Sequence, residues 1–191
     1  MPIPLLTKIM RLPAIQRQSA LSLAATIAIT LLGFLSTMLF SHLLGKDLMG
    51  VYYLFLAYFG IFNMIGDGGF GQAAVKRISE GKEQNAYLTA YAALRGILIV
   101  FSTLILITLS PLFIDLQDYN LIPWIIAALA AAFFGHTITY GVYGLGHVGV
   151  FNVGTGLSEL VRIALQIVTV LIGFSVYGLV GGFIAGIAVS G

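Results

Sequence analysis

The sequence lacks cysteine and carries very little charge. With no cysteine among its 191 residues, the chain has neither a disulfide framework nor a thiolate metal site. Charged residues make up 8% of the chain, whereas an ordinary soluble domain has ~25%. A soluble domain of this length leaves ~30% of its surface in water and needs polar groups to cover it. The composition therefore argues against soluble enzymes, disordered chains and nucleic-acid binders.

Apolar residues dominate instead, at 59% of the chain, and the mean hydropathy is +1.03. A membrane-spanning helix needs ~20 predominantly apolar residues, so a chain of this length with short loops holds about six. We therefore predict an all-α, polytopic membrane protein with about six transmembrane helices. The apolar stretches that define the predicted spans are residues 19–44, 49–74, 88–113, 121–145, 153–173 and 177–191.

Residues 1–18 form a separate basic segment that contains Lys8, Arg11 and Arg17. Its leucine and isoleucine residues favour an amphipathic segment that lies along the membrane surface. The apolar run after Arg17 continues for longer than the core of a signal peptide, which predicts a retained helix.

The distribution of lysine and arginine predicts the orientation. The N-terminal segment and the loop 76–87 are both basic, and this loop contains Lys76, Arg77 and Lys82. On the opposite side, the predicted loops carry only Lys46. Because cytoplasmic loops are enriched in lysine and arginine, we expect a cytoplasmic N-terminus.

The last apolar stretch, residues 177–191, is short for a membrane span. At 1.5 Å per residue it covers ~22 Å, whereas the hydrocarbon core is ~30 Å thick. No polar anchor follows it. We expect that the chain stops inside a helix and is part of a longer protein; a naturally short, tilted last span is the alternative.

Three glycine patterns stand out. Two match the dinucleotide fingerprint GxGxxG, but both lie at the ends of apolar helical stretches and not between a strand and a helix. We interpret them as positions of close packing, helix breaks or tight turns. The third, GxxxGxxxG, places small residues on one face, where helix backbones approach closely. The glycines are Gly66, Gly68 and Gly71, then Gly144, Gly146 and Gly149, and finally Gly178, Gly182 and Gly186.

Charged residues inside the predicted spans are the most informative feature: Asp67, Arg95, Glu159 and Arg162. At mid-membrane each costs ~2.5–3.5 kcal/mol, so such residues normally face protein or water. From the predicted orientation, all lie ~10–15 Å from the cytoplasmic helix ends. Glu159 and Arg162 are spaced i, i+3 and can pair on one helix face.

Two interpretations of these charges remain open. They could form structural ion pairs between helices, with Arg95 shallow enough to extend towards the cytoplasm. Alternatively, they could line a charged chamber that opens to the cytoplasm. There, arginine guanidinium groups suit a phosphorylated headgroup, and carboxylates suit a proton or a cation.

Other polar residues in the spans carry weaker signals. The amide side chains could bind sugar hydroxyls, although helix–helix contacts are the more common use. The histidines are isolated and show no metal-ligand spacing. No Ser–His–Asp or paired-carboxylate arrangement is visible, so we expect neither an enzyme nor a cofactor. The amide side chains belong to Asn63, Gln72, Asn152 and Gln166. The histidines are His42, His136 and His147.

Several ordered motifs resemble one family. Within residues 31–81, a leucine–glycine turn at 44–45 is followed by G-V-Y at 50–52 and D-G-G-F-G at 67–71. This run resembles the start of the polysaccharide transporters, the Wzx-type oligosaccharide flippases of the MATE-like superfamily of multidrug and lipid-oligosaccharide exporters. Residues 157–186 resemble the fifth and sixth helices of that family.

The resemblance implies two helical lobes around a central cavity, of which residues 19–191 would supply the first. It also implies transport of a polyprenyl-(pyro)phosphate-linked oligosaccharide to the outer leaflet by alternating access. Arg95 and Arg162 would contact the phosphate headgroup, and Arg17 would lie at the entrance. The implied partners are membrane lipids, the second lobe of the same protein and glycan-assembly enzymes, with no nucleic acid.

Two other functions remain as alternatives. A cation-coupled multidrug exporter of the MATE type would use Asp67 and Glu159 as its ion or proton site. A non-transporting membrane scaffold of glycan assembly would need neither. The arginines favour the flippase, because they suit an anionic substrate and repel cationic drugs.

Overall fold

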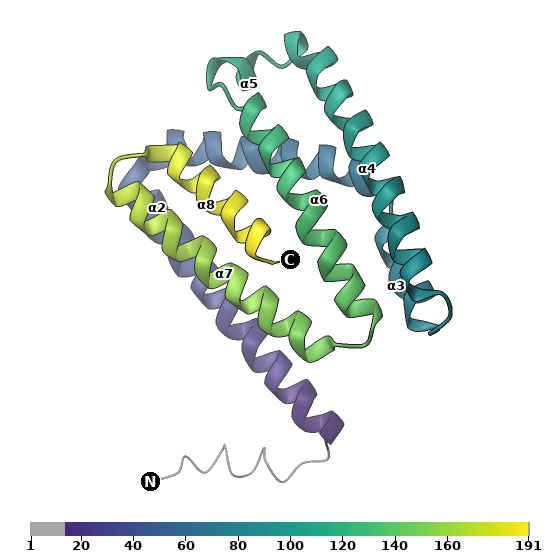
Figure 1. The fold of residues 1–191 in the computed structure, drawn as a ribbon. Helices are drawn as coiled ribbons and strands as arrows, with labels where there is room; N and C mark the ends of the chain where they lie inside the picture. Colours follow the sequence, from purple (N-terminus) through teal and green to yellow (C-terminus); the bar gives the residue numbers. More distant parts are fainter. Residues whose placement is uncertain (1–13, 191) are drawn as a thin grey trace, which may run out of the picture. The chain divides into compact units, whose positions relative to one another are not determined.

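The structure, a computed structural model, describes the backbone of residues 14–190, which consists of helices joined by short turns and has no strand. Side chains are described for residues 23, 26–147 and 149–190. Most of the predicted basic segment 1–18 thus lies outside the described residues. The helices are α2 (Ala14–Asp67), α3 (Phe70–Ser79), α4 (Gln84–Leu109), the 3-10 turn η1 (Ser110–Leu112), α5 (Ile114–Asp118), α6 (Ile122–Gly144), α7 (Val148–Leu171) and α8 (Ser175–Val189) (Figure 1).

The chain forms two compact units, residues 1–39 and 40–191. The described part of the first unit is the beginning of α2, on which large apolar side chains such as Leu31, Phe34 and Leu35 are exposed. The second unit contains the rest of α2 and every other helix that the structure describes. It holds all the charged residues predicted inside the spans.

Gly45 interrupts α2 at the position where a turn is predicted. Its φ and ψ angles are 79° and 170°, outside the helical region, while the residues on both sides are helical. A Cβ at this position would meet nothing within 4 Å. Glycine is thus required here for its backbone conformation and not for space, since a side chain disfavours positive φ.

A second break separates α2 from α3. The predicted span 49–74 ends at Asp67 in the structure, because Gly68 and Gly69 both adopt positive φ, 56° and 78°. The chain then forms α3, which takes up the start of the predicted loop 76–87. This break makes Asp67 the last residue of α2.

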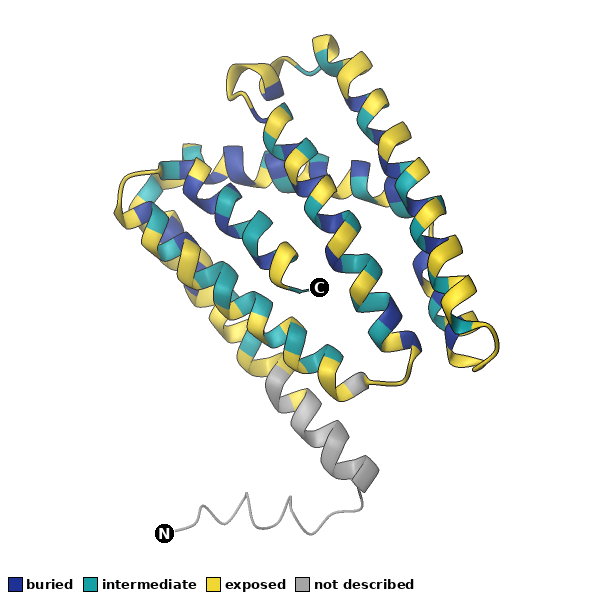
Figure 2. Cartoon of the chain, in the orientation of Figure 1, coloured by how far each residue is buried: buried dark blue, intermediate teal, exposed yellow. Residues whose placement is uncertain are grey.

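The long helices are apolar on faces that the protein does not cover. Within the described residues, Thr26–Asp67, Gln84–Leu112, Ile122–Gly144 and Gly149–Leu171 are long and apolar enough to cross a membrane. Only 11% to 33% of their most apolar windows is buried inside the protein, and Figure 2 shows exposed positions along each of them. Exposed apolar helices of this length suit lipid as the solvent.

The predicted fold class, an all-α polytopic membrane protein, is therefore confirmed. The number of six spans stays a prediction. The first of the long helices contains both predicted spans 19–44 and 49–74. The last predicted span corresponds to α8, which has 15 residues.

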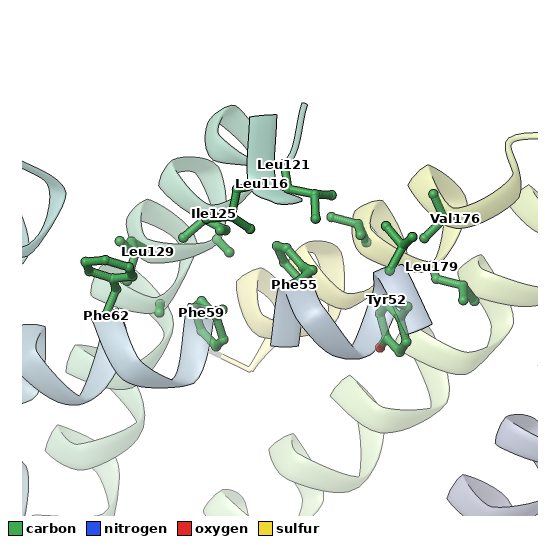
Figure 3. Packing of buried hydrophobic residues seen from close by; sticks show 14 of the residues in the cluster. Tyr52, Phe55, Phe59, Phe62, Leu116, Leu121, Ile125, Leu129, Val176 and Leu179 are labelled. Atoms are coloured by element: carbon green, nitrogen blue, oxygen red, sulfur yellow. The ribbon is translucent and has the colours of Figure 1, made fainter. Parts of the chain in front are cut away.

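A row of aromatic side chains on α2 forms the centre of the core (Figure 3). Tyr52, Phe55, Phe59 and Phe62 are all buried and spaced so that they share one helix face. Phe183 of α8 packs edge-on against two of them, with ring centroids 5.7 Å from Phe55 and 5.2 Å from Phe59. The fully buried aliphatic residues of this cluster include Leu116, Leu121, Ile125, Leu129 and Leu179.

Within the second unit, α8 packs against both α7 and α6, and α3 and α4 pack against α6 (Figure 1). The aromatic row of α2 covers α6 and α8. These contacts bring four helices, α2, α6, α7 and α8, together beside the aromatic core.

Candidate functional site

The charged residues predicted inside the spans form two ion pairs. Arg95 Nη1 lies 2.5 Å from Asp67 Oδ1, and Arg162 Nη2 lies 2.6 Å from Glu159 Oε2. The first pair joins α4 to α2, whereas the second lies within α7, at the predicted i, i+3 spacing. The two pairs differ most in access, because the Arg95 side chain is 1% exposed and that of Arg162 is 22% exposed.

Arg95 is enclosed by acceptors. Nη1 also donates to the Tyr91 hydroxyl at 2.8 Å, and this hydroxyl donates to Asp67 Oδ1 at 2.9 Å. Nη2 lies within hydrogen-bond distance of Asn63 Oδ1 and of the Ala132 carbonyl oxygen. A buried charge is tolerated only when it is paired and hydrogen-bonded, and this network meets that condition.

Local helix geometry places these groups together. Tyr91 precedes Arg95 by four residues on α4, and Asn63 precedes Asp67 by four on α2, so each pair shares a helix face. A Cβ at Gly66 would lie 2.8 Å from Ile99 Cγ1, so α2 and α4 approach closely beside the ion pair. Asp67 lies at the negative end of the α2 dipole, where a carboxylate needs a nearby cation.

A cavity of about 520 Å³ lies among α2, α6, α7 and α8. Glu159 and Arg162 are on its wall, whereas Asp67 and Arg95 are not. The wall combines aromatic rings, hydroxyl groups and one ion pair, so it offers both apolar surface and hydrogen bonds to an occupant. The lining residues with polar side chains are Tyr52, His136, Thr139, Tyr140, Thr155, Ser158, Glu159, Arg162 and Ser190.

Hydrogen bonds fix the orientation of Arg162 at this wall. Nε and Nη2 both donate to Glu159 Oε2, at 2.8 and 2.6 Å, and Nη1 donates to Gln166 Oε1 at 3.3 Å. Gln166 is fully buried and donates to the Tyr52 hydroxyl at 3.0 Å and to the Leu179 carbonyl at 2.8 Å. A guanidinium has five N–H donors, and these three bonds leave two for a ligand and for the neighbouring Tyr52 hydroxyl, which also interacts with Arg162.

The glycine face of α8 packs directly on this part of α7. A Cβ at Gly182 would lie 2.5 Å from Gln166 Cγ, and one at Gly186 would lie 2.7 Å from Arg162 Cβ. Gly178 is equally close to α7. The packing interpretation of the GxxxGxxxG pattern is thus confirmed, and the pattern positions the residues of the cavity wall.

Five of the six glycines in the other two patterns serve packing or breaks, whereas Gly149 lies inside α7 and a Cβ there would meet nothing within 4 Å. Gly68 lies in the break after α2, and Gly146 lies in the turn between α6 and α7. A Cβ at each of three further positions would come too close to a neighbouring helix: Gly66 to Ile99, Gly71 to Tyr140 and Gly144 to Ile78.

Other predicted residues fall in different places. Asn63 and Gln166 make helix–helix hydrogen bonds, as favoured from the sequence. The Arg17 side chain lies outside the described residues, so its entrance role stays a prediction. Among the described residues, no group of three or more histidine, cysteine or acidic side chains is close enough to hold a metal ion.

His136 is the functional candidate that the sequence did not reveal. It lies on α6, lines the cavity, and its Nδ1 is 2.9 Å from Arg95 Nη2. One side chain therefore touches both the buried network and the cavity. Nothing in the local sequence indicates this, because the contact joins residues 41 positions apart.

Comparison with known proteins identifies one family. The chain matches the family model described as polysaccharide biosynthesis protein over residues 15–191. No curated protein and no solved structure matches it. Members of this family are typically membrane transporters with a flippase or exporter role in polysaccharide synthesis. Because the match covers nearly the whole sequence, the chain belongs to the polysaccharide biosynthesis protein family.

Proposed function

We propose that the chain forms part of a flippase that moves a lipid-linked oligosaccharide across the cytoplasmic membrane by alternating access. In this proposal the N-terminus is cytoplasmic, and the cavity among α2, α6, α7 and α8 receives the phosphate-bearing headgroup. The observation that supports it is the position of Arg162, whose guanidinium lies on the cavity wall and uses three of its five N–H donors on Glu159 and Gln166.

The chemistry of the wall suits such a headgroup. A planar guanidinium binds phosphate oxygens through parallel N–H donors. Glu159 balances the charge of Arg162 when the cavity is empty, so an anionic headgroup arrives at a site already held in place. Tyr140, Phe151 and Phe183 add aromatic surface against which sugar rings pack.

The remaining charged residues take separate roles in this proposal. Arg17 is an entrance contact. Arg95 contacts a headgroup only in a state in which its guanidinium has left Asp67, since here it is almost fully enclosed. Asp67 and Glu159 act as counter-ions. Both carboxylates that a cation-coupled exporter would use are paired with arginine, which favours an anionic substrate.

Replacing Arg162 with alanine tests this function. We expect the flipping rate to fall about 10- to 100-fold, because the variant loses a charged hydrogen bond worth ~1.5–3 kcal/mol. The measurement uses the full-length protein in liposomes and a polyprenyl-pyrophosphoryl disaccharide with a fluorescent label. The readout is the fraction of probe that an impermeant quencher reaches after transport.

Arg77→Ala is the matched control. Arg77 also forms an i, i+3 pair, with Glu80, but both side chains are well exposed and neither lines the cavity. Its flipping rate should equal that of the wild type. Normal flipping by Arg162→Ala would exclude the headgroup role, and a wild-type protein that does not move the probe would favour a scaffold.

A further inference from the structure

His136 links the buried ion pair of Arg95 and Asp67 to the cavity that Arg162 and Glu159 line. Its Nδ1 lies 2.9 Å from Nη2 of Arg95, which is itself held by Asp67 and Tyr91. The same residue lines the cavity that contains Arg162 on its wall. The arrangement assigns a different task to each of the two ring nitrogens.

The contact with Arg95 determines which nitrogen carries the proton. A guanidinium has N–H donors and no acceptor, so Nδ1 must accept the hydrogen bond. The imidazole is therefore neutral, with its proton on Nε2. A proton on Nδ1 would remove this bond and would place two cations 2.9 Å apart.

Nε2 is left available to a ligand. It forms no hydrogen bond with any residue in the part of the chain that the structure describes. Within that part, Arg95 Nε is the one buried side-chain nitrogen or oxygen without a partner, so Nε2 of His136 is accessible and not enclosed. Since His136 lines the cavity, Nε2–H is a donor that an occupant can reach.

Most other neutral donors on the described wall are already used. The serine and threonine hydroxyls of the wall all donate to backbone carbonyl oxygens. These hydroxyls belong to Thr139, Thr155, Ser158 and Ser190. The phenol groups of Tyr52 and Tyr140 remain, but their hydrogens rotate. The imidazole differs from them because Arg95 fixes both its tautomer and one edge of its ring.

We propose that His136 is a substrate-binding residue that donates a hydrogen bond from Nε2 to an oxygen of the transported headgroup. Arg95 and Asp67 act as positioning residues, since they hold the imidazole neutral and in place. This proposal rests on the proposed function, because it concerns the same cavity. It predicts a preference for headgroups that present an acceptor oxygen to α6.

Two amide variants separate the functions of the two ring nitrogens. In His136→Asn, the amide oxygen takes the place of Nδ1, so Arg95 keeps its acceptor but the cavity loses its donor. In His136→Gln, the amide nitrogen takes the place of Nε2, so the donor remains, but Nη2 of Arg95 loses the nearest of its three acceptors and keeps Asn63 and Ala132. His136→Asn should therefore weaken ligand binding, and His136→Gln should lower the stability of the protein.

The test measures binding to the purified full-length protein by calorimetry, together with its melting temperature. The probes are farnesyl pyrophosphate, which has no sugar, and farnesyl-pyrophosphoryl-N-acetylglucosamine. For His136→Asn we expect about tenfold weaker binding at an unchanged melting temperature. For His136→Gln we expect binding within about threefold of the wild type and a lower melting temperature.

Each result has a definite meaning. Equal loss of both probes in His136→Asn supports a contact with a phosphate oxygen, and loss of the sugar-bearing probe alone supports a contact with the sugar. Binding that falls only when the melting temperature falls would overturn the proposal, since that pattern indicates a structural role. Wild-type protein that binds neither probe would overturn the proposed function, and with it this inference.

Discussion

Replacement of Arg95 by methionine is expected to lower the free energy of unfolding by about 3 kcal/mol. Removing one partner of a buried ion pair costs ~3–5 kcal/mol, and the 20% exposure of Asp67 places the effect at the lower end. The Tyr91 hydroxyl and the Ala132 carbonyl lose a donor at the same time. At ~2–4 °C per kcal/mol, the melting temperature in detergent should fall by about 6–12 °C.

Two controls show whether the effect comes from the unpaired charge. Arg77→Met removes an exposed arginine from an i, i+3 pair and should change the melting temperature by at most about 4 °C, because such surface pairs contribute ~0–1 kcal/mol. The double variant Asp67→Leu/Arg95→Met removes both charges and should recover much of the loss. Equal melting temperatures for Arg95→Met and Arg77→Met would contradict the prediction.

The sequence identified the charged residues because lipid makes them rare, but it did not reveal all of their partners. Glu159 and Arg162 pair within one helix, so their spacing was sufficient to predict the contact. Asp67 and Arg95 are 28 residues apart, on helices whose packing depends on the whole fold. The role of His136 follows from a contact across 41 residues and has no local signal.

The boundary between the second predicted span and the loop after it was wrong for a different reason. The basic residues after Gly71 favoured a loop, yet the structure forms α3 there. Gly71, Ala74 and Ile78 are buried at spacings of three and four residues, which is the pattern of one helix face. Lys76 and Arg77 lie between them on other faces. This amphipathic spacing was visible in the sequence, whereas a count of apolar residues alone conceals it.

Gly182→Ala is expected to destabilise the protein by about 1–3 kcal/mol, the usual cost of overpacking. The new Cβ would lie 2.5 Å from Gln166 Cγ, 3.0 Å from Gln166 N and 3.2 Å from the Arg162 carbonyl oxygen. Two of these atoms belong to the backbone of α7, so the clash is relieved only by moving that helix. Because Arg162 and Gln166 move with α7, flipping of the labelled probe should slow as well.

Gly60→Ala is the matched control, since Gly60 is also helical but a Cβ there meets nothing within 4 Å. Alanine in that open helical position should be neutral or stabilise by up to ~1 kcal/mol. The measurement is the melting temperature of each variant in detergent. An equal fall for Gly182→Ala and Gly60→Ala would contradict the packing argument. Truncating the nearest side chain, in Gly182→Ala/Gln166→Ala, should not restore stability, because the backbone contacts remain and the hydrogen bonds of Gln166 to Tyr52 and Leu179 are lost.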